Sequence, residues 1–139
     1  MIVQHSSIQY LGLDLICRMH RDQILKHGGI LGVRDLGLLK SAIDEPKATF
    51  DQVDLYPELF DKAAATFVLL VKNHPFIDGN KRIGVVVMGM LLSLNGLELI
   101  MDPESLYDMA IDIATSKLNI MQVAVILKKN SVRFDLPNK

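Results

Sequence analysis

The chain has 139 residues, of which half are hydrophobic and 22% are charged. This is the size and composition of one globular domain, and it excludes an intrinsically disordered chain. The formal net charge of −1 provides no positive field to neutralise a phosphate backbone, so we expect no DNA or RNA partner.

Apolar spacing predicts a long first helix and a short second one. Apolar side chains recur every three or four residues over 7–27, where Ser6 or Ser7 is a possible N-cap and a glycine pair follows as a stop. Asp35 caps the second helix, which Pro46 ends because a proline lacks an N–H and restricts the residue before it. A glycine-rich segment therefore separates two helices.

The middle of the chain predicts a loop or small hairpin and then two helices. Residues 47–57 show no helical period, whereas the apolar spacing over 59–73 is that of an amphipathic helix, which ends before His74 because a proline follows. The next apolar run, over about 80–95, is too long for a strand and ends at an Asn-Gly pair. Because this helix is apolar all round, we expect it to be central and buried on every side.

Two further helix starts follow, each marked by a capping side chain. Asp102 precedes a proline and an acidic residue, and Asn119 precedes an apolar run that ends in two lysines. We therefore predict an all-α fold of about six helices around the central helix at about 80–95. A single domain spans 1–131, and residues 132–139 form a C-terminal tail of uncertain order.

Cysteine usage and hydropathy favour a cytoplasmic protein. Cys17 is the only cysteine, which excludes an intramolecular disulfide and a cysteine-based metal cluster and fits a reducing compartment. The N-terminal residues lack the pattern of a secretory signal. The longest uncharged apolar run, 83–94, is shorter than the ~20 residues that span a membrane, so we expect no membrane partner.

The loop between the third and fourth helices concentrates polar chemistry, because residues 74–82 are His-Pro-Phe-Ile-Asp-Gly-Asn-Lys-Arg. His74 is the natural general base, since an unperturbed imidazole titrates near ~6.5. Asp78 can hold a hard divalent cation, and beside phosphates that cation is Mg²⁺ by default. Gly79 lets the backbone come close to a ligand. The loop therefore predicts a base next to a metal-assisted anion site.

The start of the fourth helix adds donors and positive charge to the same place. Its first turn presents free N–H groups and the positive end of the helix dipole, to which the side chains of Asn80, Lys81 and Arg82 contribute. Asp78 could instead serve as the helix N-cap, and the two roles are compatible. Phe76 is more typical of a buried anchor for the loop than of a ligand contact. A purely structural junction has no need of this combination.

Residues 74–82 resemble the signature of the Fic/Doc family, H-P-F-x-[DE]-G-N-[GK]-R, and match it closely. The segment 28–43 and the apolar helix that ends at Asn95-Gly96 also resemble the Doc (death-on-curing) branch, so the likeness covers most of the chain. This resemblance implies an all-helical Fic fold, ATP and Mg²⁺ as cofactors, and transfer of part of the nucleotide to a hydroxyl of a target protein.

The resemblance also implies a role for each residue of the loop. His74 becomes the base that deprotonates the target hydroxyl, and Asp78 supports the metal and the site geometry. Phe76 packs inward. The residues that bind phosphates are Gly79, Asn80, Lys81 and Arg82. The segment 47–57 falls where the family has its flap, which aligns the target segment.

Two positions depart from the adenylylating pattern, which continues G-N-G-R-x-x-R. Lys81 stands at the second glycine and Val85 at the last arginine. The lysine fills space where a phosphate would approach bare backbone, and it is typical of the Doc branch, in which the γ-phosphoryl group is transferred. The resemblance therefore favours phosphoryl transfer over AMP transfer, because positioning of the phosphates is most of the catalysis. The apolar Val86 removes a nucleotide contact that the Doc branch has.

The resemblance implies two protein partners. One is a target whose Ser or Thr is modified, such as elongation factor Tu or another translation factor. The other is a Phd-like antitoxin, because the self-inhibitory pattern [ST]-x-x-x-E-[GN] is imitated only from Ser41 to Glu45 and Pro46 breaks it. The antitoxin tail would fold into a groove of this domain.

A second hypothesis, from another class, is a catalytically inactive helical binding module. The intact His74 and Asp78 argue against it. Three basic residues near the end of the first helix could add charge near the site, but lone basic residues are more often solvated, so no role is assigned to them: Lys26, His27 and Arg34.

Overall fold

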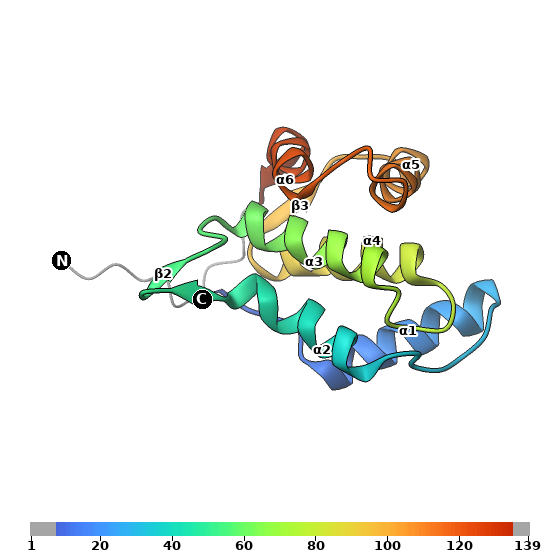
Figure 1. The fold of residues 1–139 in the computed structure, drawn as a ribbon. Helices are drawn as coiled ribbons and strands as arrows, with labels where there is room; N and C mark the ends of the chain where they lie inside the picture. Colours follow the sequence, from blue (N-terminus) through green and yellow to red (C-terminus); the bar gives the residue numbers. More distant parts are fainter. Residues whose placement is uncertain (1–7, 135–139) are drawn as a thin grey trace, which may run out of the picture.

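The computed structural model describes residues 8–134, and six α-helices make up most of this part (Figure 1). The helices are α1 (Leu13–His27), α2 (Leu36–Asp44), α3 (Leu59–Asn73), α4 (Asn80–Leu94), α5 (Pro103–Ala114) and α6 (Ile120–Lys129). The shorter elements are the 3-10 turn η2 (Glu45–Lys47) and the strands β1 (Thr49–Phe50), β2 (Val53–Asp54), β3 (Leu97–Leu99) and β4 (Ser131–Arg133). The predicted all-α fold of about six helices is confirmed.

The most enclosed helix is α3. It contacts α2, α4, α5 and α6, and every residue from Lys62 to Val68 is buried. The sequence places the fully buried helix at 80–95 instead, and in this detail the prediction is wrong. On α4, Met90 and Leu94 are 41% and 44% exposed. The reason is that α1, α3, α5 and β3 flank α4 without closing over its outer face.

Helices α3 and α4 lie side by side and run in opposite directions (Figure 1). Gly84 permits their close approach, because a Cβ at this position would lie 3.1 Å from side-chain atoms of Phe67 and Val71. The short loop between the helices therefore brings the C-terminus of α3 against the N-terminus of α4. This junction is where the polar motif lies.

Helix α1 begins later than the sequence predicts. Residues 8–12 are not helical, and the N-cap Gly12 has extended backbone angles. The side chain of Asn95 instead holds the backbone of Gln9, because Gln9 N donates to Oδ1 at 2.8 Å and Nδ2 donates to Gln9 O at 3.0 Å. The predicted caps, Ser6 and Ser7, lie outside the described residues.

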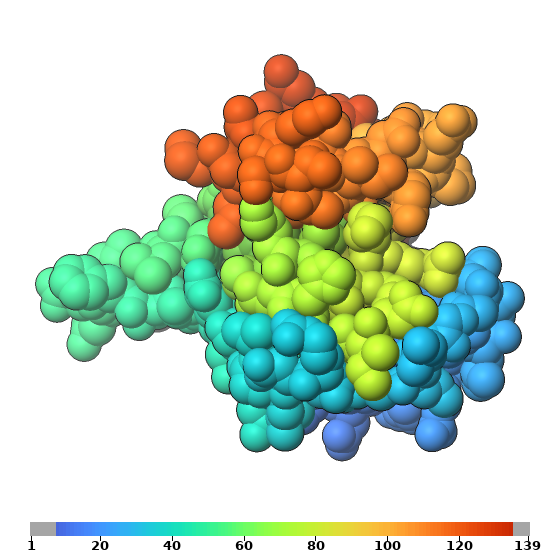
Figure 2. Space-filling model, turned by 45° about the vertical axis from the view of Figure 1, so that its right-hand side comes forward, coloured from blue at the N-terminus to red at the C-terminus, as the bar shows by residue number. Residues whose placement is uncertain are grey.

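The predicted hairpin is present as β1 and β2, which pair antiparallel with Thr49 opposite Asp54. Lys62, near the start of α3, fixes the hairpin: its buried Nζ donates to Asp54 Oδ2 at 3.1 Å and to Tyr56 O at 2.5 Å. Figure 2 shows the hairpin as a projection from the body of the molecule.

The position of the hairpin contradicts its expected role as a flap beside His74. The hairpin is attached to the first turns of α3, whereas His74 follows the last turn (Figure 1). Asn73 lies eleven positions after Lys62, a separation of about 16 Å along the helix at about 1.5 Å per residue. Glu45, the last matching residue of the imitated self-inhibitory pattern, also lies at the hairpin, because its carboxylate accepts a hydrogen bond from Tyr56 Oη at 3.1 Å.

The predicted side-chain caps hold for α2 and α6, whereas Asp102 is the N-cap residue of α5 without a side-chain capping hydrogen bond. Asp35 accepts a hydrogen bond from Leu38 N at 3.0 Å, and Asn119 accepts one from Gln122 N at 2.9 Å. Beyond α6 the chain continues as β4, which pairs antiparallel with β3, so Val132 and Arg133 of the predicted tail of uncertain order form part of a strand. Residues 135–139 lie outside the described part. No helix within residues 8–134 has the length and hydrophobicity to cross a membrane.

Candidate active site

The loop between α3 and α4 is bounded by two residues with left-handed backbone angles. His74 is the C-cap of α3 with φ 51° and ψ 53°, and Gly79 is the N-cap of α4 with φ 75° and ψ 21°. Positive φ is uncommon for histidine and is a conformation that surrounding contacts must enforce. His74 itself is exposed, so its ring is accessible to a ligand.

Asn80 is the buried centre of the loop. Its Oδ1 accepts from Phe76 N at 2.9 Å and its Nδ2 donates to Phe76 O at 3.0 Å, which fixes the orientation of the amide. The same Nδ2 lies 3.1 Å from Nδ1 of His74. Because Nδ2 is a donor, Nδ1 of His74 accepts. The side chain of Asn80 is therefore occupied within the loop, and what it leaves for a phosphate is its backbone N–H.

Arg34 caps the end of α3, although the sequence gives no sign of this role. Its Nε donates to His74 O at 2.6 Å and its Nη2 donates to Asn73 O at 2.8 Å. The backbone N–H groups of Arg34 and Asp35 both donate to Pro75 O, at 2.7 and 3.0 Å. Segment 32–35, rather than the hairpin, thus borders the loop and holds His74 in its conformation. Lys26 and His27 are exposed at the end of α1.

Asp78 is exposed and is not the N-cap of α4, so that alternative is wrong. Its Oδ1 accepts from Gly79 N at 2.9 Å and its Oδ2 accepts from Ile30 N at 3.2 Å. A Cβ at Gly29 would lie 2.9 Å from Oδ2, which explains a glycine at this position. The segment after α1 therefore sets the direction of the carboxylate.

A cavity of about 160 Å³ lies at this junction. It is lined by His74, Ile77, Asp78, Gly79, Asn80, Lys81, Arg82 and Tyr107. Phe76 is 1% exposed and packs beneath the loop, as an anchor does. The structure thus brings the predicted base, the predicted metal ligand and the predicted phosphate-binding residues into one pocket. The pocket is smaller than a typical site for a whole ligand of drug size, and its size suits phosphate groups.

The first turn of α4 has unused donors and unpaired charge. The first backbone hydrogen bond of this helix runs from Ile83 N to Gly79 O, so the N–H groups of the preceding turn are not used in the helix. The ion pairs found within residues 8–134 involve Lys62 and Lys128, so Lys81 and Arg82 have no acidic partner in this part of the chain. Such a helix start attracts anions.

Comparison with known proteins identifies the family. The model of the Fic/DOC family matches residues 10–92, which include the whole loop and most of α4. The chain belongs to the Fic/DOC family. It is also similar to Toxin Doc of Mycolicibacterium smegmatis (strain ATCC 700084 / mc(2)155), with 40% identity over 102 residues that cover 72% of this chain and 78% of the relative. The resemblance to the Doc branch is confirmed.

Tyr107 is a part of this Fic/DOC pocket that sequence reasoning misses. It comes from α5, is 45% exposed, and is the one lining residue from outside the loop and the start of α4. No local pattern marks it, because only the packing of α5 on α4 brings it to the pocket.

Asp78 is the residue of the Fic/DOC loop whose carboxylate could serve as a metal ligand. Within residues 8–134, no cluster of three or more His, Cys, Asp or Glu side chains could enclose a metal by itself. Mg²⁺ does not need such a cluster, because one or two carboxylates, water and substrate phosphates satisfy it. Asp78 faces the pocket beside the cationic helix start, so its carboxylate fits Mg²⁺ that arrives with a nucleotide.

Proposed function

We propose that this protein is a Doc-like toxin that transfers the γ-phosphoryl group of ATP to a Ser or Thr hydroxyl of a target protein. The observation that carries the proposal is the shared pocket of His74, Asp78 and the α4 N-terminus. It combines a base, a carboxylate for Mg²⁺ and an anion site. The similarity to Toxin Doc supports the toxin role.

The phosphate-binding part consists of main-chain and side-chain groups. The free N–H groups of the first turn of α4 point along the helix axis, where the helix dipole is positive. Lys81 and Arg82 stand on this turn and line the cavity. They would hold the phosphates of ATP, and Asp78 would hold Mg²⁺, which when bound neutralises charge on the phosphate oxygens.

The reaction that these groups support is an in-line displacement. The target hydroxyl oxygen forms a bond to the γ-phosphorus while the bond from that phosphorus to the β–γ bridging oxygen breaks, and ADP leaves. The hydroxyl proton passes to the imidazole of His74. Arg34 and Asn80 contribute by holding His74 at the edge of the pocket. Arg34 Nε lies 2.6 Å from the His74 carbonyl oxygen, and Asn80 Nδ2 lies 3.1 Å from His74 Nδ1.

Lys81 supports phosphoryl transfer over AMP transfer. Lys81 lines the pocket at the helix N-terminus, at the position where the adenylylating pattern has a glycine. A glycine there lets a phosphate lie against the backbone, whereas a lysine favours a different placement of the triphosphate. AMP transfer by the same loop is the alternative reaction.

The proposal includes the partners that a Doc-like toxin needs. The target is a translation factor, with elongation factor Tu as the first choice, and a Phd-like antitoxin restrains the toxin in the cytoplasm. The similarity to Toxin Doc supports this pairing.

A modification assay tests the proposal. The purified protein is incubated with ATP, Mg²⁺ and elongation factor Tu, and in parallel with a bacterial lysate, and the intact mass of each modified protein is measured. Added phosphate that disappears with His74→Ala is the expected result. Added AMP would instead establish the alternative reaction, and no product that depends on His74 would overturn both.

A growth experiment distinguishes an enzyme from a binding module. Expression of the wild-type chain is expected to arrest bacterial growth, and His74→Ala is expected to remove the arrest. His74 is exposed, so this variant should fold. Equal arrest by both chains would show that catalysis is not the function.

A further inference from the structure

His20 is a buried polar residue behind the active-site loop. It lies on α1, is 2% exposed, and shares the buried face of this helix with Ile16 and Ile24. Its neighbours one turn away on that face are thus both apolar. A buried imidazole is costly unless it is hydrogen-bonded, so a residue that served packing alone would be apolar here.

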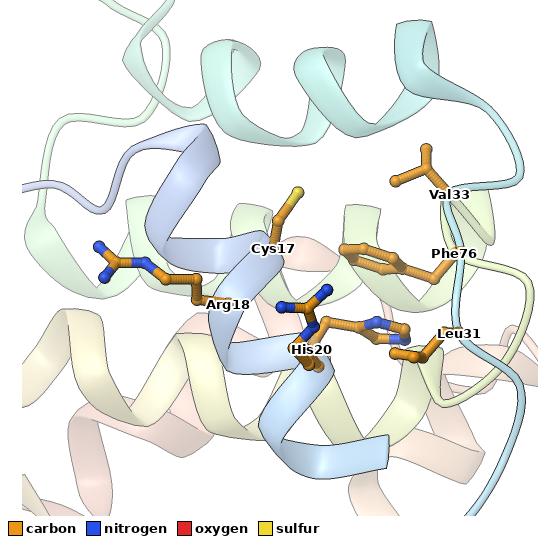
Figure 3. A pocket seen from close by; sticks show the side chains of 8 residues that line it. Cys17, Arg18, His20, Leu31, Val33 and Phe76 are labelled. Atoms are coloured by element: carbon orange, nitrogen blue, oxygen red, sulfur yellow. The ribbon is translucent and has the colours of Figure 1, made fainter. Parts of the chain in front are cut away.

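The ring of His20 makes two specific contacts with the loop. Its Nε2 lies 2.8 Å from the backbone O of Asp78. Its plane stacks on Phe76 with a centroid separation of 3.8 Å and an angle of 8° (Figure 3). Because a carbonyl oxygen only accepts, Nε2 must carry the proton and donate it. The stacking therefore fixes the orientation of the ring, and the hydrogen bond fixes Nε2–H as its donor to the loop.

The hydrogen bond controls the peptide that joins Asp78 to Gly79. A Cβ at Gly79 would lie 3.6 Å from Nε2 of His20, so the N-cap of α4 also lies against this ring. Among the described residues, His20 is the donor found for the Asp78 carbonyl, whereas the Asp78 carboxylate has separate donors. The orientation of this peptide sets where the carboxylate and the first N–H groups of α4 point.

We propose that His20 is a positioning residue of the active site, which orients the Asp78–Gly79 peptide through its Nε2–H. The proposal rests on the proposed function, because the ligand that benefits is Mg²⁺ with ATP. His20 does not line the cavity that contains His74 and Asp78. It lines a separate cavity of about 380 Å³ behind the loop, together with Arg18, Leu31 and Phe76 (Figure 3). Its effect is therefore exerted through the backbone of the loop.

Two variants separate the donor from the ring. His20→Phe keeps a ring that can stack on Phe76 and lacks the donor. His20→Gln lacks the ring and places an amide N–H near the position of Nε2. We expect His20→Phe to weaken binding of Mg²⁺·ATP by about tenfold, measured by calorimetry, because an unpaired carbonyl frees the peptide. We expect His20→Gln to stay within about threefold of the wild type.

A second readout does not depend on ATP. Amide hydrogen exchange at Gly79 and Ile83, whose N–H groups bond to Asp78 Oδ1 and Gly79 O, is expected to accelerate in His20→Phe and not in His20→Gln, while exchange in α3 and α6 stays unchanged. If circular dichroism shows that His20→Phe is unfolded, His20→Asn replaces it. The asparagine side chain is one methylene shorter than that of glutamine, so its amide does not reach the Asp78 carbonyl.

The two readouts distinguish the possible failures. If the wild type binds no Mg²⁺·ATP, the proposed function fails, and local exchange alone decides the role of His20. Exchange and binding equal to the wild type in the donor-free variant would overturn the proposal. So would a glutamine variant as impaired as the phenylalanine variant, since a restored donor would then fail to restore the loop.

Discussion

The side-chain amide of Asn80 lies 3.1 Å from Nδ1 of His74, and the backbone of Phe76 fixes which end of that amide faces the ring. His74 thus faces a donor at Nδ1, which places the proton of the neutral ring on Nε2. Asn80 therefore fixes both the position of the His74 ring and its resting tautomer.

Asn80→Asp is expected to reverse this tautomer. A carboxylate at the same place accepts from Nδ1–H, so the ring proton should move from Nε2 to Nδ1, which the ¹⁵N chemical shifts of the imidazole report. The Phe76 carbonyl also loses its donor, so the free energy of unfolding should fall by about 1–3 kcal/mol in urea titrations. Asn119→Asp is the control, because aspartate also caps a helix and Asn119 does not line the cavity that contains His74. An unprotonated Nδ1 in Asn80→Asp would contradict the prediction.

Arg34→Lys is expected to loosen the end of α3. The guanidinium reaches the carbonyls of His74 and Asn73 with two separate nitrogens, and a single ammonium group does not reproduce this geometry. We expect a loss of about 1–2 kcal/mol in stability, measured by urea titration, and a lower rate of the His74-dependent modification. Arg21→Lys, at an exposed position on α1, is the matched control and should leave both quantities unchanged. Equal behaviour of the two variants would show that Arg34 is only a surface cation.

Gly79→Ala and Gly89→Ala should have opposite effects on stability. Gly79 has φ 75° and its Cβ would lie 3.3 Å from Ile24 Cδ1, so alanine there should cost about 1–2 kcal/mol and distort the start of α4. Gly89 lies inside α4 with nothing within 4 Å of a Cβ, so alanine should stabilise the protein by about 0.5–1 kcal/mol. Thermal unfolding of both variants tests the pair, and a destabilised Gly89→Ala would refute this account of the helix.

Lys81→Gly is expected to shift the product from phosphate to AMP. Removal of this side chain opens the pocket at the α4 N-terminus, so a phosphate can approach the backbone as in the adenylylating pattern. The mass of the modified target measures the outcome, and Lys81→Met, which keeps the bulk and removes the charge, is the control. An unchanged product in Lys81→Gly would show that another residue selects the transferred group.

The elements that the sequence predicted well are those with local causes. The loop of residues 74–82 is contiguous, so its chemistry is visible without a fold, and the caps Asp35 and Asn119 act on the N–H groups three residues ahead. Apolar spacing located α3 and α4 for the same reason, because a helix is built from neighbours in the chain.

Long-range contacts decided the rest. Gln9 lies outside α1, contrary to the prediction, because its backbone is bound by Asn95, 86 residues away. The hairpin lies at the start of α3 because Lys62 holds it there, away from His74. The contact that holds the end of the loop is also long-range, because Arg34 is 40 residues from His74.

The loop residues that would meet the substrate were thus determined by the sequence alone, and the residues that hold them in place were decided by the tertiary structure. His20 is 58 residues from Asp78, and nothing in the sequence around it indicates a role in the loop. Its role follows from the packing of α1 behind the loop, since a hydrogen bond between distant segments leaves no pattern in either segment.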